Sequence, residues 1–171
     1  MTTYYYTASS VDGFIADADN SLSWLLSRDV DHEKDMGFET FRPLVGACAM
    51  GATTWQWILD NDPGEWSAKP TWVFTHRDFQ PTEHVTFTQG DVTAVHREMV
   101  EAAGGLGVWI VGGGELVGQF ADAGLLDEVW VQWAPVTLGS GAPLLPRRLE
   151  LKLEEVVRNR ELVCGRYTLV R

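Results

Sequence analysis

Basic residues are scarce in this chain of 171 residues. It has 13 lysines and arginines against 24 aspartates and glutamates, which gives a formal net charge of −11 at pH 7. A protein with this charge repels the phosphate backbone of nucleic acids and anionic membrane surfaces. We therefore expect neither nucleic acid nor a membrane as its partner.

The chain also lacks the features of secreted and membrane proteins. Its two cysteines, Cys48 and Cys164, cannot build a disulfide framework, and no apolar run is long enough to span a membrane. No basic and apolar leader precedes the first strand-like run. Because no internal repeat or low-complexity linker divides it, residues 1–171 are expected to form one cytoplasmic domain.

Several motif-based enzyme classes are excluded as well. The four histidines show no H-E-x-x-H pattern and no pairing with cysteine, so we expect no metal site. A G-K-[ST] phosphate loop is absent, and a G-x-G-x-x-G loop starting at Gly112 fails because its last position is Val117. Ser140 lies outside the strand-to-helix turn that a hydrolase nucleophile needs.

Strands and helices are expected to alternate along most of the chain. Apolar or β-branched runs predict strands at residues 2–9, 47–50, 71–75, 85–88, 107–111 and 129–133. Helical spacing predicts helices from about residue 31 to Pro43, at 54–59, at 92–102 and at 115–123, while 12–20 looks like a loop. The segments 150–157 and 161–170 are expected to pair as a hairpin around Asn159. This order favours an α/β fold with a mostly parallel sheet, an antiparallel edge and helices on both faces.

Three consecutive glycines form the strongest local feature. Gly112, Gly113 and Gly114 join a strand without polar alternation to a helix. Free backbone N–H groups at such a helix start bind phosphate oxygens, and the helix dipole adds to the attraction. The alternative is that the glycines serve only a tight turn and close packing of helix on sheet.

Six segments in order resemble a known family. They are ASSVDGFIA at 8–16, MGATTW at 50–55, VFTHR at 73–77, IVGGGEL at 110–116, AGLLDE at 123–128 and APVTLGSGAPL at 134–144. Together they make the chain similar to the dihydrofolate reductase-like superfamily, and within it to the RibD C-terminal family of riboflavin-biosynthesis reductases. The resemblance implies an eight-stranded mixed sheet, NADPH as hydride donor and a homodimer.

The resemblance also implies a set of cofactor-binding residues. The backbone at Ala8 and Ile15 would hold the nicotinamide, and Thr75 and Arg77 would lie beside the adenosine half. The phosphates would be held by Gly51, Thr53, Thr54, Gly112, Gly113, Gly114, Glu115, Leu116 and Val117. Where the family commonly has a basic residue after the first glycine, this chain has Ala52. NADH is therefore possible, although Arg77 can compensate for the missing charge at the 2′-phosphate.

The substrate end is less defined in the sequence. By the resemblance, Asp29 or Asp35 falls near the family's acidic position and could relay a proton or anchor a substrate. The alternative for each is a solvated residue at a helix start. Trp24 and Phe38 are candidate pocket walls, with core packing as the alternative, whereas Trp109 and Trp130 are assigned to core strands.

These features together indicate an NADPH-dependent reductase of a small heterocyclic or carbonyl compound, of the pterin or pyrimidinone kind. The alternative is a nucleotide-binding or sensory protein of the same fold without turnover, because no proton donor stands out in the sequence. A scaffold subunit with an empty pocket is a third possibility.

Overall fold

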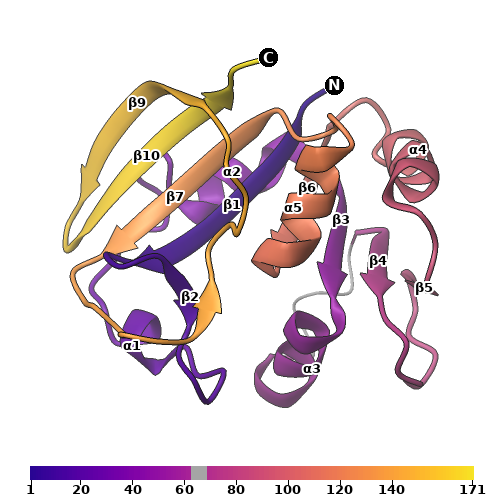
Figure 1. Ribbon diagram of the computed structural model, residues 1–171, viewed down its shortest axis with the longest axis horizontal. Helices are drawn as coiled ribbons and strands as arrows, with labels where there is room; N and C mark the ends of the chain where they lie inside the picture. Colours follow the sequence, from indigo (N-terminus) through magenta and orange to yellow (C-terminus); the bar gives the residue numbers. More distant parts are fainter. Residues whose placement is uncertain (63–68) are drawn as a thin grey trace.

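An eight-stranded sheet forms the centre of the computed structural model, which describes residues 1–62 and 69–171. The strand order is β5-β4-β3-β6-β1-β7-β10-β9 (Figure 1). Neighbours from β5 to β7 are parallel, and β10 is antiparallel to both β7 and β9. The strands are β1 (Thr3–Ser10), β3 (Val45–Gly51), β4 (Thr71–Phe74), β5 (Val85–Thr88), β6 (Gly107–Gly112), β7 (Glu128–Ala134), β9 (Leu151–Asn159) and β10 (Leu162–Leu169). The expected mostly parallel sheet with an antiparallel hairpin at its edge is confirmed.

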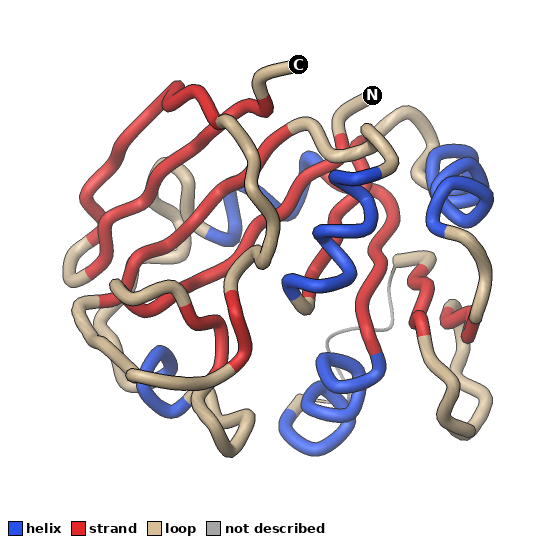
Figure 2. The backbone as a smooth tube through the Cα atoms, viewed as in Figure 1, coloured by secondary structure: helices blue, strands red, loops and turns tan. Residues whose placement is uncertain are grey.

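Helices cover both faces of this sheet (Figure 2). Since successive strand residues point to opposite faces, Tyr5 and Tyr6 of β1 enter different cores. Tyr5 belongs to the cluster under α4 and α5, and Tyr6 stacks on Phe41 of α2 on the other face. The helices are α1 (Ser23–Leu26), α2 (Phe38–Phe41), α3 (Ala52–Asn61), α4 (Val92–Ala102) and α5 (Gly114–Asp122), with a 3-10 turn η1 (Arg42–Leu44) after α2.

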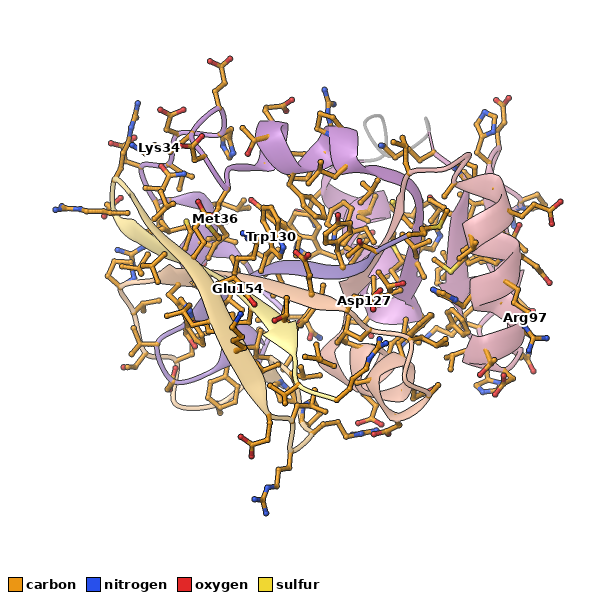
Figure 3. All side chains as sticks on the ribbon, turned by 90° about the horizontal axis from the view of Figure 1, so that it is seen from above. Lys34, Met36, Arg97, Asp127, Trp130 and Glu154 are labelled. Carbon is orange, nitrogen blue, oxygen red and sulfur yellow. The ribbon has the colours of Figure 1, made fainter. Side chains whose placement is uncertain are left out.

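The expected helix from residue 31 to Pro43 is wrong. Only α2 and η1 form there. The backbone before them is hydrogen-bonded to residues that are distant in the sequence, and it adopts a conformation that is not helical. The side chain of Asn159, fully buried, accepts from the Asp31 N–H at 3.0 Å and donates to the Asp31 carbonyl at 2.8 Å. Met36 then adopts a left-handed φ of 64°. Figure 3 shows Met36 beside Trp130, and the two pack together, whereas Lys34 is exposed.

The segment 12–20 is not wholly a loop. Phe14–Ala16 forms β2, which pairs with the two-residue β8 (Ala142–Pro143) as a separate small sheet. Asp12 holds the chain before β2 in place, because its carboxylate accepts hydrogen bonds from the Leu138 and Gly139 N–H groups at 3.0 and 2.7 Å. The hydrogen bond from the Ser10 hydroxyl, together with these two, holds the pKa of Asp12 below its ordinary value. The two loops therefore meet at the carboxyl end of β1.

Candidate functional site

A cavity of about 900 Å³ lies at the carboxyl ends of the parallel strands. Its wall includes Ala8 of β1, Gly51 of β3 and Val111 of β6, all near the ends of their strands. Parallel strands end at one edge of a sheet, which is where α/β proteins bind ligands. The volume is at the upper end of the range for small-molecule sites, roughly 300–1,000 Å³.

One end of the cavity is formed by the start of α5. Gly113, Gly114, Glu115 and Leu116 all line it, and no side chain caps the helix. The first N–H groups of a helix have no intrahelical acceptor, so they are available to a ligand. Gly112 precedes them at a φ of +144°, which favours glycine, and the Gly112–Gly113 peptide bond is cis.

The start of α3 forms the neighbouring wall. Gly51 is its N-cap residue without a side-chain cap, and Ala52, Thr53 and Thr54 also line the cavity. Because β3 and β6 are adjacent and parallel, the helices that follow them both begin at this cavity. We call this part, Gly51–Thr54 and Gly113–Leu116 together, the glycine half. Two helix starts carrying partial positive charge favour a ligand with several anionic oxygens.

Close backbone contact explains one glycine of this half. A Cβ atom on Gly114 would collide with the carbonyl oxygens of Pro143 and Leu144, whereas a Cβ on Gly113 would meet open space. Gly114 therefore permits tight packing of α5 on β8, and Gly113 leaves the cavity open. Both alternatives considered for the glycine run, packing and an open helix start, occur in this turn.

Several residues assigned to the cofactor by resemblance lie behind the wall or outside it. Val117 is fully buried in the core cluster, and Gly112 is buried in the turn. Thr75, also buried, accepts from the Arg77 N–H at 2.8 Å. Arg77 is exposed just after β4 and does not line the cavity. By contrast, Ala8, Ile15, Gly51, Thr53, Thr54, Gly113, Gly114, Glu115 and Leu116 all line it.

The other end, which we call the aromatic half, is formed by Tyr6, Phe38, Trp109 and Gln132. The three rings contact one another with centroids 5.9 to 6.3 Å apart. Residues 25–32 close this half with Leu25, Arg28, Val30 and His32, and β10 adds Leu162. Such a mainly apolar and aromatic wall suits a planar ring.

Gln132 is held at both ends of its carboxamide. Its Nε2 donates to the Met36 carbonyl at 2.7 Å, and its Oε1 accepts from the Sγ of Cys164. The Tyr6 hydroxyl also donates to the Met36 carbonyl, at 3.2 Å. Burial raises the pKa of Cys164 to about 11, so the thiol keeps its proton at neutral pH and can donate it. The left-handed Met36 backbone thus fixes two cavity-lining side chains.

The two aspartates suggested as catalytic groups lie outside the cavity. Asp29 is exposed and pairs with Arg160 in the turn between β9 and β10. Asp35 is exposed in the turn before Met36. The expected helix from residue 31, which would have included Asp35, does not form, and neither aspartate lines the cavity. Their geometry supports the alternative of solvated surface residues.

The aromatic residues also differ from the assignment made from sequence. Trp24 is buried at 8% exposure without lining the cavity, and its Nε1 donates to the Ser21 carbonyl. Trp109 and Trp57 do line it, so limiting the pocket tryptophans to Trp24 was wrong. Trp109 is both a core and a wall residue, a double role that strand periodicity does not reveal.

Sequence reasoning missed Tyr6, Arg28, His32 and Gln132 as cavity residues. The sequence does contain a signal for Gln132 as a site residue. It is the one uncharged polar residue in the apolar strand segment 129–134. No local signal pointed to Arg28 or His32, which reach the cavity through an irregular segment. Among the described residues, no group of three or more His, Cys, Asp or Glu side chains could hold a metal ion. In the same residues, no helix has the length and apolar character needed to cross a bilayer.

Known proteins share this architecture. A Shewanella sp. PV-4 protein whose name relates it to riboflavin biosynthesis has a TM-score of 0.83 and 27% identity, with all of both chains covered. The deaminase and 5-amino-6-(5-phosphoribosylamino)uracil reductase of Thermotoga maritima has a TM-score of 0.69 at 16% identity, over 99% of this chain and 56% of that one. The latter likeness shows the fold alone, which is the dihydrofolate reductase-like class of α/β fold found in RibD-type reductases.

Sequence relatives lead to the family itself. The Bacillus subtilis protein YwjB is 35% identical over 144 residues, which cover 83% of this chain and 81% of YwjB. The model of the RibD C-terminal domain matches residues 3–164. The chain therefore belongs to the RibD C-terminal domain family, and the resemblance inferred from six sequence segments is confirmed.

Proposed function

We propose that the protein is an NADPH-dependent reductase that transfers a hydride to a small heterocyclic or carbonyl compound. The observation that carries this proposal is one cavity with two chemically different halves. The glycine half offers two uncapped helix starts for a diphosphate, and the aromatic half offers a mainly apolar wall for a planar ring. A dinucleotide and a ring substrate placed end to end require this division.

The residues present fit a nicotinamide dinucleotide. The diphosphate would be held by the N–H groups of residues 113–116 and by the Thr53 and Thr54 hydroxyls, since all of them line the cavity. Ala8 and Ile15 also line it, where the nicotinamide would lie between the two halves. When bound, the cofactor supplies the hydride, and the protein supplies position and electrostatics. Arg28 and His32 can donate hydrogen bonds to a substrate oxygen in the aromatic half.

The preference for NADPH over NADH is assigned to Arg77. Ala52 places no charge at the start of α3. Arg147, the cation beside Glu115, is already paired with that carboxylate at 2.7 Å. Arg77 follows β4 three residues after Phe74, which lies opposite Gly51 in the sheet. Its exposed side chain therefore lies beyond the carboxyl end of β4, the strand next to β3, where a 2′-phosphate could be paired.

A binding protein without turnover is the second candidate. It is favoured by one observation: both aspartates considered as proton donors lie outside the cavity. A sensor would retain the glycine half and bind the dinucleotide without oxidising it.

Two measurements separate these functions. Thermal unfolding is followed with NADPH, NADH and FMN, and NADPH oxidation is followed by absorbance with pterins, quinones and pyrimidinones. Ligand at 100 times its dissociation constant should stabilise the reductase by about 2.7 kcal/mol. The reductase predicts both the shift and oxidation with at least one substrate class. A shift with no oxidation across the panel indicates the sensor, and no shift with any nucleotide contradicts both.

The protein is further proposed to be a cytoplasmic homodimer. On β9 and β10 the side chains of Leu151, Leu153, Val156 and Val163 are exposed by 38 to 56%. Cross-strand register puts them on one face, because Leu153 lies opposite Tyr167 and, past a bulge, Val156 lies opposite Gly165. Figure 1 shows no helix in front of β9 and β10, whereas α2 lies on the opposite face of the sheet. An uncovered apolar sheet face of this kind suits a second copy of the chain.

Leu153→Glu tests the dimer. The charge would be buried at the interface, so sedimentation should give one chain mass for the variant and two for the unaltered protein. Lys152→Glu, a neighbouring exposed residue on the other side of β9, is the control and should leave the dimer intact. An unaltered protein that sediments as a monomer would contradict this assignment.

A further inference from the structure

Gln132 is a polar residue in an otherwise apolar position. It lies in the middle of β7, opposite Ala8 of β1 and Cys164 of β10, and only 4% of its surface is exposed. Burying a carboxamide is unfavourable unless its groups are hydrogen-bonded. The hydrogen-bonding groups of such a carboxamide in a cavity wall can face the protein, the ligand or both.

Two neighbouring groups define the hydrogen bonds that Gln132 makes with the protein. The Met36 carbonyl can only accept, so it faces the Nε2, and the protonated Cys164 thiol donates to the Oε1. A glutamine carboxamide has two N–H donors and two acceptor lone pairs, and these two bonds use one of each. Within the described part of the chain it makes no other hydrogen bond, so one N–H and one lone pair in a single amide plane are left for a ligand.

Charge in the same region limits what that ligand can be. Arg28 is the only described lysine or arginine that lines the cavity, and it is engaged twice. Its Nε donates to the Trp24 carbonyl at 2.9 Å, and its guanidinium lies 3.7 Å from the Glu161 carboxylate. Among the described lining residues, a phosphate group on the substrate would find no lysine or arginine besides Arg28, whereas a neutral ring would be surrounded by Tyr6, Phe38 and Trp109.

We propose that Gln132 is the specificity-determining residue of the aromatic half, and that it selects an uncharged planar ring with a lactam edge. In a lactam a ring N–H stands beside a C=O, so the ring N–H donates to Oε1 while the C=O accepts from Nε2. The inference rests on the proposed function, because it assigns this half of the cavity to the substrate. It adds the residue that recognises the substrate and the class of compound recognised.

The experiment uses quinazolin-4(3H)-one and its 3-methyl derivative, which lacks the ring N–H. Their binding to the full chain, saturated with NADP⁺, is measured by calorimetry. The unaltered protein should bind the lactam at least about tenfold more tightly than the methylated compound, the size expected for a lost hydrogen bond in a buried site. Gln132→Met, which conserves volume, should reduce this preference to less than about twofold. Gln119→Met, the same substitution at an exposed position, should leave it unchanged.

Equal binding of the two compounds by the unaltered protein overturns the proposal, and so does a preference that persists in Gln132→Met. Binding of neither compound also overturns it. Should Gln132→Met fail to fold, equal binding of the two compounds by the unaltered protein still overturns the proposal. Failure of the proposed function is distinguishable, because it appears as absence of NADP⁺ binding in the titration that precedes the lactam.

Discussion

The two halves of the cavity are constructed in different ways. The glycine half is formed where regular strands turn into regular helices, β3 into α3 and β6 into α5. The aromatic half is closed by residues 25–32, which belong mostly to irregular backbone and are held by Asn159 and Glu161 more than 120 positions away in the sequence. Local geometry therefore makes the first half, and long-range hydrogen bonds make the second.

Gly114→Ala should have the largest effect on the glycine half. Its Cβ would meet backbone oxygens of residues 143 and 144, which cannot rotate away as a side chain can. We expect a loss of about 3 kcal/mol or more in the free energy of unfolding, measured with urea. Gly113→Ala is the matched control, because its Cβ has open space and its φ is −74°. Equal stability of the two variants would contradict the close packing of α5 on β8.

Asn159→Ala should affect the aromatic half selectively. It removes two hydrogen bonds to Asp31 from a fully buried position, at a cost of about 2 to 3 kcal/mol in unfolding free energy. Binding of quinazolinone should weaken while the dissociation constant of NADPH stays within about twofold. Asn61→Ala, at an exposed asparagine whose side chain donates to the Trp57 carbonyl of α3, serves as control. Equal loss of both ligands in Asn159→Ala would show that the halves are not independent.

Arg77→Ala should have a smaller effect that is confined to one cofactor. Loss of a charge-assisted bond to the 2′-phosphate weakens NADPH binding about tenfold and leaves NADH binding unchanged. Fluorescence titration with both dinucleotides measures this difference. Arg97→Ala is a suitable control, since Arg97 is exposed on α4 and points away from the sheet (Figure 3). An unchanged NADPH affinity in Arg77→Ala would remove Arg77 from the cofactor site.

Asp12 should produce the smallest effect, one that depends on pH. Its folded-state pKa is lowered, so the stability it contributes is present above the ordinary aspartate pKa of 3.8 and is lost as the pH falls through the folded value. The thermal midpoint of Asp12→Asn should therefore fall less between pH 5 and about pH 3 than that of the unaltered protein. A control substitution, Asp19→Asn, at an exposed residue whose side chain holds no other loop, should keep the full fall. Identical pH profiles for all three proteins would exclude a stabilising role for the Asp12 carboxylate.

The same difference between the halves explains what could be predicted from sequence. Gly113 and Gly114 were identifiable because glycine at a strand-to-helix turn has a local cause, while Gly51 was assigned through the family resemblance. Strands such as 107–111 and the capped helix after Asp91 were also found, and Asp91 does accept from the Thr93 and Ala94 N–H groups. Asp29 and Asp35 were assigned through the family resemblance, which could not show that the Asn159 side chain holds the intervening Asp31 backbone outside any helix. Contacts between residues so distant in sequence leave no periodic pattern in either segment.

The central claim is that the glycine half binds the diphosphate of a nicotinamide dinucleotide. A crystal structure of the protein with NADP⁺ tests it most directly. The account predicts diphosphate oxygens within about 2.7–3.2 Å of backbone N–H groups of residues 113–116, with the nicotinamide beside Ala8 and directed toward Gln132. A dinucleotide bound elsewhere, or its diphosphate in the aromatic half, would contradict the account.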